Sequence, residues 1–272
     1  MTDGRPPLAG PPDAPTALPR ALRSLVGHRA HEIAWRNQLG GIAVRVEGDD
    51  GPWWVKWAPA GTDLDLPAEA TRLAWAAAYT PVPRVLEEGT DDEGTWLVLT
   101  ALHGESAVST RWKADPRTAV RAIGEGLRAF HRALPVASCP FGWSATDRLA
   151  VVEQRAATGV LDAGRWHRDH HALGVDEALA RLRDQPEITH LVVCHGDACA
   201  PNTLLGADGR WVGHVDLGSL GVADPWADLA IATWSCDWNY GPGWDDELLA
   251  AYGIAPDPDR TSYYRLLWDL GP

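Results

Sequence analysis

The chain changes its pattern of apolar and polar positions near residue 104. Before that point, apolar residues come in short runs separated by glycines and acidic residues, which is typical of strands and turns. One segment is instead spaced as a helix, with Asp65 at the capping position and Pro67 in the first turn. The pattern predicts strands at 42–47, 53–57, 84–88 and 95–102, and helices at 19–25 and 65–78.

After residue 104, apolar residues recur at helical spacing. The clearest example begins at the capping residue Asp115 and carries Val120, Ile123 and Leu127 on one face. Helices are expected at 115–134, 151–156, 175–182, 228–235, 245–252 and 259–270, with a buried strand at 191–194 and a hairpin formed by 203–205 and 211–215.

These patterns predict an α+β protein with two structural units. The N-terminal unit, over residues 1–102, is small and rich in strands, and the C-terminal unit, over 103–272, is larger and mainly helical. The boundary is placed near 102–105, where an apolar strand gives way to polar residues and glycine. Repeated prolines within residues 1–17 predict a flexible arm.

Composition limits the classes of partner. The chain of 272 residues has a formal net charge of −13, which disfavours nucleic acid and favours cationic ligands. Its apolar runs are far shorter than the roughly 18 residues of a membrane span, and its first residues show no secretory signal. Four cysteines without paired spacing indicate free thiols and no zinc site. We therefore expect a cytoplasmic monomer that binds neither nucleic acid nor membranes.

The segment His195-Gly196-Asp197-Ala198-Cys199-Ala200-Pro201-Asn202 carries the strongest chemical signal. It follows an apolar strand directly, so Asp197 is expected at a strand end. The hairpin then returns the chain and places Asp216 next to Asn202. Two oxygen ligands at one point suit Mg²⁺, which takes few protein ligands. Asp197 is not needed as a metal ligand, so it can act as a base that accepts or orients the proton of a hydroxyl group.

This spacing resembles the kinase loop H-R-D-x-x-x-x-N, with Asp216-Leu217-Gly218 in the place of D-F-G. Phosphoryl transfer also needs a cation for the nucleotide phosphates, which kinases supply as a strand lysine held by a helix glutamate. Only two of the 24 basic residues are lysines, Lys56 and Lys113. Lys56 lies within a strand and Glu69 inside the next helix, so we expect this pair to bind ATP, and Lys113 to be a solvated surface residue.

The connection at residues 100–104 is predicted to contact the nucleotide base. Backbone groups at Thr100 and Leu102 can bind adenine whatever their side chains are. A glycine-rich phosphate loop is nearly absent, since only Gly40-Gly41 stands where one is expected.

With these motifs, the chain resembles the aminoglycoside O-phosphotransferases of the 3′/3″ branch from about residue 32 to the end. The resemblance implies a two-lobed protein-kinase-like fold, Mg²⁺ and ATP, and inactivation of an antibiotic. It assigns Lys56 and Glu69 to the phosphates, Asp197 to the base and Asn202 and Asp216 to magnesium, with Asp228 as a structural brace. It is carried by Val55-Lys56, Glu69, Cys139-Pro140-Phe141, 193–202, Val215-Asp216-Leu217-Gly218, 221–228 and Tyr263-Tyr264-Arg265-Leu266-Leu267.

Family members gather carboxylates around the ammonium groups of the drug. By this resemblance Asp269 near the C-terminus is the clearest substrate residue, with Asp162, Asp169 and Asp237 as further candidates. Alternatively, Asp162, Asp169 and Asp237 each belong to an acidic surface that is simply exposed to solvent.

Departures from the kanamycin and neomycin enzymes point to a different drug. Ser219 and Pro225 stand where arginines are usual, and Trp268 replaces a carboxylate near the end. Fewer acidic groups and 15 tryptophans suit flat guanidinium groups, which stack on indole rings. Streptomycin has such groups, so the sequence favours a streptomycin 3″-phosphotransferase that confers resistance.

Several alternatives remain open. The chain can be a kanamycin or neomycin 3′-phosphotransferase, a kinase of another small alcohol, or an inactive protein that sequesters drug or nucleotide. The complete set of kinase residues argues against the inactive binder. The short segment between Asp216 and Asp228 disfavours a protein kinase, because it leaves no room for an activation loop.

Overall fold

The computed structural model describes residues 9–10, 12 and 16–271, and the chain divides after His103 into two compact units. The expected flexible arm at 1–17 falls mostly outside the described residues. Ala9–Gly10 (β1) are described, and they pair with β2 (His31–Asn37), so these two residues belong to a sheet and not to a loose arm.

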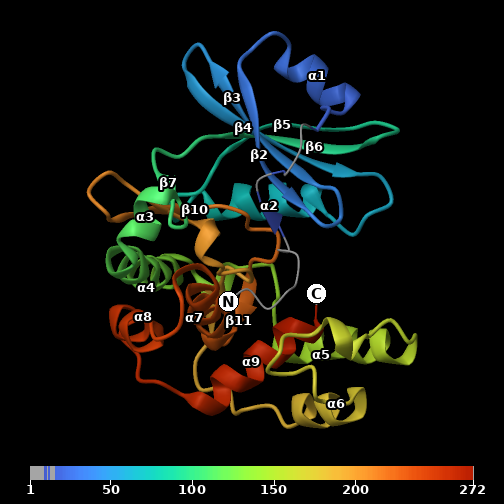
Figure 1. Ribbon diagram of the computed structural model, residues 1–272, viewed down its shortest axis with the longest axis vertical. Coiled ribbons are helices and arrows are strands. Elements are labelled where there is room, and N and C mark those ends of the chain that lie inside the picture. The colour runs from blue at the N-terminus through green and yellow to red at the C-terminus, as the bar shows by residue number, and fades with distance from the viewer. Residues whose placement is uncertain (1–8, 11, 13–15, 272) are drawn as a thin grey trace. The chain divides into compact units, whose positions relative to one another are not determined.

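The first unit is built on one six-stranded antiparallel sheet (Figure 1). The strand order is β1-β2-β3-β4-β6-β5, and Gly51, with φ of 114°, begins β4 at the tight turn after β3. The expected strands and helices are confirmed within a few residues at each end. The elements are α1 (Arg20–Val26), β3 (Ile42–Gly48), β4 (Gly51–Pro59), α2 (Leu66–Ala76), β5 (Val85–Thr90) and β6 (Gly94–Thr100).

Successive side chains of β4 point to opposite faces of the sheet, so that one face packs in the core and the other carries Lys56. Val55 is fully buried in a cluster with Leu22 and Val26 of α1. Lys56, the next residue, points to the opposite face of the sheet and reaches α2. Asp65 caps α2 as expected, because its side chain accepts a 2.9 Å hydrogen bond from the backbone N–H of Ala68.

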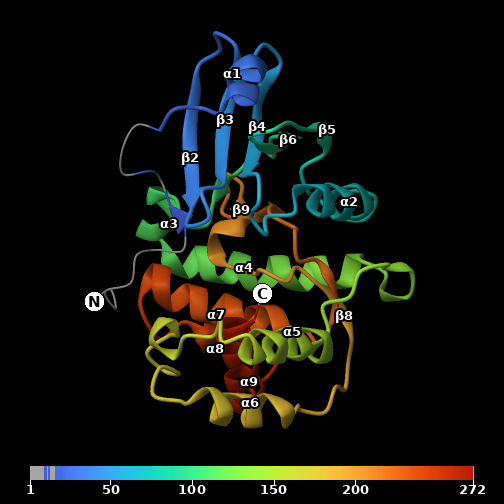
Figure 2. The same ribbon diagram turned by 90° about the vertical axis from the view of Figure 1, so that its right-hand side faces the viewer.

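The second unit is mainly helical. α4 (Pro116–Ala133) extends across it, with the other long helices on one side and the β9–β10 hairpin on the other (Figure 2). Asp115 caps α4, and Val120, Ile123, Leu127 and Phe130 form its buried face. The remaining helices are α3 (Thr110–Ala114), α5 (Ala145–Ala157), α6 (Val175–Arg183), α7 (Trp226–Tyr240), α8 (Asp245–Tyr252) and α9 (Pro258–Leu270).

Two small sheets lie among these helices, with strand orders β10-β9-β7 and β11-β8. Their strands are β7 (Glu105–Ser106), β8 (Val192–Cys194), β9 (Thr203–Leu205), β10 (Trp211–His214) and β11 (Gly221–Ala223). The sequence predicted β8 and the hairpin, but not β7 or β11, because strands this short show no periodicity. Among the described residues, no helix is both long and apolar enough to cross a membrane.

Two helices extend beyond their expected limits. α5 begins at Ala145 rather than 151, because the Ser144 side chain caps it by accepting the backbone N–H of Asp147 at 3.1 Å. Its first turn carries Arg148, which is buried and lies over the ring of Trp143 at 4.7 Å. α7 runs to Tyr240 rather than 235, through the polar residues Asp237 and Asn239. In both helices polar residues interrupt the apolar spacing on which the sequence prediction rests.

Candidate active site

The loop after β8 carries Asp197 and is held from below by Asp228 in the first turn of α7. The Asp228 carboxylate is fully buried and accepts hydrogen bonds from the backbone N–H of His195 (2.6 Å) and of Gly196 (2.9 Å). His131 of α4 lies 2.9 Å from the same carboxylate and 2.8 Å from the hydroxyl of Tyr252. The expected bracing role of Asp228 therefore has a direct structural basis.

The electrostatics of Asp228 suit that role. Burial by itself would raise the pKa of this carboxyl, but the hydrogen bond and charge of His131, together with His195, outweigh it and hold the pKa below its usual value. The potential ligand atoms of His131, Cys194 and Asp228 lie within 4.8 Å of one another. Hydrogen bonds already engage all three side chains, including that from Cys194 to the carbonyl of Asp224 at 3.3 Å.

His195 links the loop to the strand that leads into Asp216. Its Nδ1 accepts the backbone N–H of Asp197 at 3.2 Å, so Nε2 carries the proton and donates to the carbonyl of Val215 at 2.9 Å. Gly196 adopts φ of 84°, and a Cβ there would lie 2.1 Å from the carbonyl oxygen of Ser219. Only glycine fits between these two loops, which explains the glycine of His195-Gly196-Asp197.

Asn202 faces Asp197 with its amide nitrogen. Nδ2 donates to the carbonyl of Asp197 at 3.0 Å and to its carboxylate at 3.1 Å. Both partners are acceptors, so the amide oxygen must point the other way. The backbone N–H of Val215 donates to the carbonyl of Asn202 at 3.0 Å, and this contact brings Asp216 next to Asn202 as the sequence predicted.

Asp216 adopts φ of 67°, the one positive value among the described residues other than glycine. Such a conformation is uncommon and is concentrated at functional sites. Burial raises the pKa of Asp197, and the nearby charge of Asp216 raises it further. A cation between the Asn202 amide oxygen and the Asp216 carboxylate would offset that repulsion, and these two oxygens are the hard ligands that Mg²⁺ prefers. The residues therefore fit a magnesium ion.

In the first unit, Lys56 and Glu69 form the expected pair. Lys56 Nζ lies 2.6 Å from Glu69 Oε1, and the two side chains are 18% and 4% exposed. The other lysine, Lys113, is exposed as expected. At the proposed base-binding segment, the backbone N–H of Thr100 donates to the carbonyl of Arg84 at 2.9 Å, so this N–H is used within the sheet. Leu102 is half-buried.

Three tryptophans of α7 and α9 pack against one another in tilted and edge-to-face pairs, and we call them the tryptophan cluster: Trp234, Trp238 and Trp268. Their ring centroids are separated by 5.1 Å (Trp234 and Trp238), 5.6 Å (Trp238 and Trp268) and 6.1 Å (Trp234 and Trp268). Trp234 is buried, Trp268 is half-buried and Trp238 is exposed. The cluster therefore presents an indole surface to solvent.

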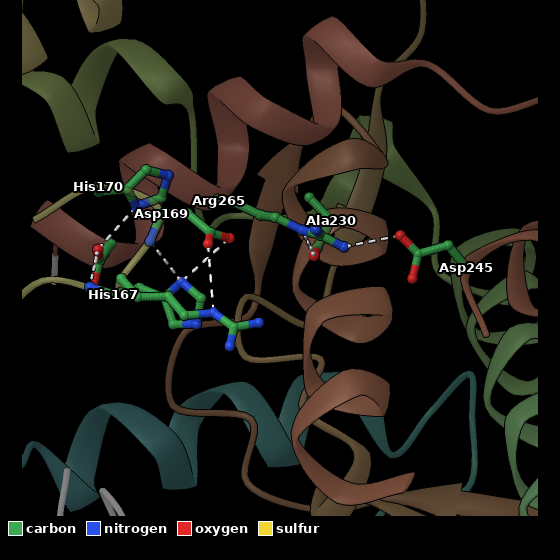
Figure 3. A network of polar contacts seen from close by, with 8 residues as sticks. His167, Asp169, His170, Ala230, Asp245 and Arg265 are labelled. Atoms are coloured by element: carbon green, nitrogen blue, oxygen red, sulfur yellow. Dashed lines mark hydrogen bonds and ion pairs between the residues drawn. The ribbon is translucent and has the colours of Figure 1, made fainter. Parts of the chain in front are cut away.

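Asp269, which the resemblance assigns to the substrate, has its side chain largely engaged inside the protein. Its Oδ2 accepts the backbone N–H of His167 at 2.7 Å and lies 2.9 Å from His170 Nδ1, and its side chain is 7% exposed. Figure 3 shows His167 and His170 together in this network, and both rings pack edge-on against Trp234. Asp269 thus holds the loop before α6 against the tryptophan cluster.

The other substrate candidates lie in different settings. Asp237 follows Cys236 on α7 and accepts the backbone N–H of Gly243, while its Oδ1 is buried with no hydrogen-bond partner among the described residues. Burial and the nearby Asp245 raise the pKa of Asp237. Asp245 in turn pairs with Arg265 at 3.1 Å (Figure 3). Asp162 and Asp169 are exposed, and Asp162 caps a short turn through Gly164.

Two residues that support this loop were not indicated by the sequence pattern: His131, which contacts the Asp228 carboxylate, and Ser235, whose hydroxyl oxygen accepts the backbone N–H of Ala200 at 2.9 Å. His131 was detectable, because it continues the buried stripe of α4 four residues after Leu127. Ser235 stood out only as a polar residue within an apolar helix.

Comparison with known proteins identifies the family. The profile of the phosphotransferase enzyme family matches residues 40–264. The chain belongs to that family. It is therefore a phosphotransferase, and the resemblance to aminoglycoside phosphotransferases drawn from its motifs is confirmed.

Two relatives and one solved structure show the range of similarity. An aminoglycoside 3′-phosphotransferase of Streptomyces fradiae is 38% identical over 77% of this chain and 81% of its own. A streptomycin 3″-kinase of Streptomyces griseus is 37% identical over 79% of this chain and 83% of its own. The structure of the Streptomyces rimosus phosphotransferase APH(3″)-Id with ADP and streptomycin has a TM-score of 0.73 and 30% identity, covering 92% of this chain and 95% of that one. The expected kinase-like fold class is confirmed.

Proposed function

We propose that this phosphotransferase transfers the γ-phosphoryl group of ATP to a hydroxyl of an aminoglycoside, and that streptomycin, at its 3″ hydroxyl, is the preferred acceptor. The observation that carries the reaction is the arrangement around Asp197. Its carboxylate is fixed by Asn202, its loop is braced by Asp228, and Asp216 lies just beyond the end of β10.

In the proposed reaction, Asp197 orients the acceptor hydroxyl and takes its proton as the oxygen attacks the γ-phosphorus. ADP is the leaving group. Because the transition state of phosphoryl transfer is loose, most of the catalysis comes from positioning and charge stabilisation. The hydrogen bond from Asn202 fixes the direction in which the carboxylate of Asp197 points, which supports that role.

Nucleotide binding is assigned to Lys56, Glu69 and the segment at Thr100 and Leu102. Glu69 holds the ammonium of Lys56 in place, so the lysine is oriented before ATP arrives. Mg²⁺ bound by the Asn202 amide oxygen and the Asp216 carboxylate would neutralise charge on the phosphates.

The preference for streptomycin rests on the tryptophan cluster. A guanidinium group is planar and weakly hydrated, so it stacks well on an indole face. Trp238 offers such a face to solvent, and Asp237, a further candidate, precedes it on α7 with its Oδ1 buried. Asp162 is a further exposed carboxylate for a cationic substrate, whereas Asp269 has at most its second oxygen to offer. The name of the Streptomyces griseus relative supports the same acceptor.

The test is a panel assay with ATP and Mg²⁺ on streptomycin, kanamycin, neomycin and hygromycin, with the phosphorylated position read by NMR. We expect streptomycin to be phosphorylated at the 3″ hydroxyl with the highest kcat/KM. Asp197→Ala is expected to lose about 10²-fold or more in turnover, because it removes the proton acceptor. Asp208→Ala, an exposed aspartate in the β9–β10 turn, serves as the matched control. Full activity of the Asp197 variant would refute its role.

A second function is a 3′-phosphotransferase for kanamycin or neomycin. The observation in its favour is the sequence identity to the Streptomyces fradiae 3′-phosphotransferase, 38%, which is nearly the same as the 37% identity to the streptomycin kinase. A higher kcat/KM for kanamycin with a 3′ product would support this function and remove streptomycin as the preferred acceptor.

A further inference from the structure

The guanidinium group of Arg265 joins α9 to α7 and α8. Its Nε donates to the carbonyl of Ala230 at 3.2 Å, and its Nη2 donates to the hydroxyl oxygen of Thr233 at 3.0 Å and to the carboxylate of Asp245 at 3.1 Å. Figure 3 shows the guanidinium directed towards Ala230 and Asp245. The hydroxyl proton of Thr233 is used within α7, on the carbonyl of Leu229 at 2.9 Å or of Ala230 at 3.0 Å, so its oxygen remains to accept from Arg265.

These hydrogen bonds fix the plane of the guanidinium group. Nε and Nη2 lie on one edge of a flat, rigid fork, and acceptors from two helices meet that edge. The Arg265 side chain is 17% exposed, and Ala230 and Thr233 are buried, so water competes little for these bonds. A lysine at this position has no such fork and could not hold a plane.

The guanidinium group held in this way lies over the ring of Trp234. Its Cζ is 5.6 Å from the ring centroid, within the range of a cation–π contact. The rings of His167 and His170 pack edge-on against the same indole, with centroids at 4.4 Å and 5.5 Å. Trp234 is buried, so its orientation is set by these contacts and by its neighbours in the tryptophan cluster.

Trp234 in turn supports the exposed indole of the cluster. The ring of Trp238 lies 5.1 Å from that of Trp234 at an interplanar angle of 42°, so a rotation of Trp234 would change the support beneath Trp238. Trp238 is 42% exposed, and it is the surface to which the proposed function assigns a guanidinium group of the drug. A continuous set of contacts therefore runs from Arg265 through Trp234 to that surface.

We propose that Arg265 is a positioning residue for drug selection, which fixes Trp234, and through it the exposed face of Trp238, in the orientation that stacks on a guanidinium group. This inference rests on the proposed preference for streptomycin. Arg265 acts through Trp234 in this assignment and does not touch the drug. The loop of Asp197 is held by Asp228, a different residue of α7, so the effect falls on drug binding and not on the transfer step.

The experiment measures steady-state kinetics of the full chain with ATP, using streptomycin and the best ammonium drug of the panel. Arg265→Met is expected to raise the KM for streptomycin by about threefold to tenfold, in line with a weakened cation–π contact. The values of kcat, the KM for ATP and the KM for the ammonium drug should stay within about twofold. Arg265→Lys should behave like Arg265→Met, because an ammonium group cannot hold the plane. Arg181→Met, at an exposed arginine of α6, is the matched control.

The combination with Trp238→Ala shows whether the arginine acts through the cluster. In that background, Arg265→Met should change the KM for streptomycin by less than about twofold, because the surface it orients is gone. Thermal unfolding of each variant shows whether it folds. If Arg265→Met does not fold, Asp245→Asn carries the test with a rise of about twofold to threefold in the same KM, because it weakens one bond to Nη2 at a side chain that is 38% exposed. An unchanged KM for streptomycin, an equal rise for both drugs, or full additivity with Trp238→Ala would overturn the inference.

The result can be told apart from a failure of the proposed function. If the wild type does not phosphorylate streptomycin, the proposed acceptor is wrong, and the role of Arg265 is refuted with it. If the wild type prefers streptomycin while Arg265→Met keeps the same KM for it, only the positioning role of Arg265 is wrong.

Discussion

Lys56 and Glu69 form a short, nearly buried ion pair, with Nζ and Oε1 separated by 2.6 Å, between β4 and α2. Removing one partner leaves the other charge poorly compensated, which is more damaging than losing an exposed pair. The pair also has a natural control, because Lys113 is the second lysine of the chain and is exposed.

We expect Lys56→Ala to lower kcat/KM for ATP by about 10²-fold or more, through loss of the cation that binds the phosphates. Glu69→Gln should cost less, because the lysine remains but is no longer held. Lys113→Ala should leave the kinetics unchanged. Equal kinetics in the Lys56 and Lys113 variants would show that Lys56 does not bind the nucleotide.

The tryptophan cluster gives a prediction on substrate choice. Trp238→Ala removes the exposed indole and should lower kcat/KM for streptomycin by about tenfold, in line with the loss of one cation–π contact. The same variant assayed with kanamycin is the control, since ammonium groups depend less on a flat stacking surface. A parallel loss for both drugs would mean that Trp238 shapes the site and does not select guanidinium.

The brace at Asp228 is expected to matter for both stability and turnover. Asp228→Asn keeps the size of the side chain but turns one of its two acceptor oxygens into a donor, which then faces a backbone N–H. We expect a loss of about 2–3 kcal/mol in the free energy of unfolding, measured with urea, because a buried donor is left unsatisfied. Turnover should fall as the loop before Asp197 loses its support. Asp246→Asn, at an exposed position on α8, is the comparison variant, and equal stability of the two would contradict the bracing role.

Acid sensitivity follows from His214, which is buried beside Phe130. Burial, and to a lesser extent His195 and His131, holds the pKa of His214 well below its ordinary value of about 6.5. The folded state therefore keeps this ring neutral while the unfolded state takes up a proton below about pH 6.5. Stability is unaffected above that pH and falls below it, by at most about 1.4 kcal/mol per pH unit for this group.

His214→Asn is the variant that checks this dependence. Asparagine removes the titration and keeps an acceptor near Nδ1, which takes the indole N–H of Trp211 at 3.1 Å. Its unfolding free energy should fall less steeply between pH 6.5 and 5 than that of the wild type. Part of the slope should persist, because burial also lowers the pKa of His167. An unchanged slope would remove His214 as a source of acid sensitivity.

Local signals explain how much of the fold was predictable. α2 and α4 begin at capping aspartates and keep an apolar stripe, so their positions follow from short-range sequence. β7 and β11 have two and three residues, and their pairing with β9 and β8 depends on segments distant in the chain. No local pattern specifies such strands.

The residues of the candidate site also include some that the sequence pattern indicated and some that it did not. Lys56 and Glu69 form the ion pair that the sequence predicted, and Asn202 contacts Asp197 and precedes Asp216 as predicted, while their roles in phosphoryl transfer stay a prediction. The resemblance assigned Asp269 to the substrate, which stays a prediction, and no spacing indicated that His167 and His170 would contact its carboxylate. Ala200 and Ser235 become neighbours only because α7 packs against the loop, which no spacing along the chain encodes.

α7 carries two separate groups of residues on two of its faces. Asp228 and Ser235 are seven positions apart and share one face, which turns towards the loop of Asp197. Trp234 and Trp238 are four positions apart and share another, which forms part of the tryptophan cluster. Under the proposed function, a gene selected by a new antibiotic can alter the exposed position 238 while positions 228 and 235 stay constant. The two faces of one helix would then let the choice of drug change without disturbing the loop of Asp197.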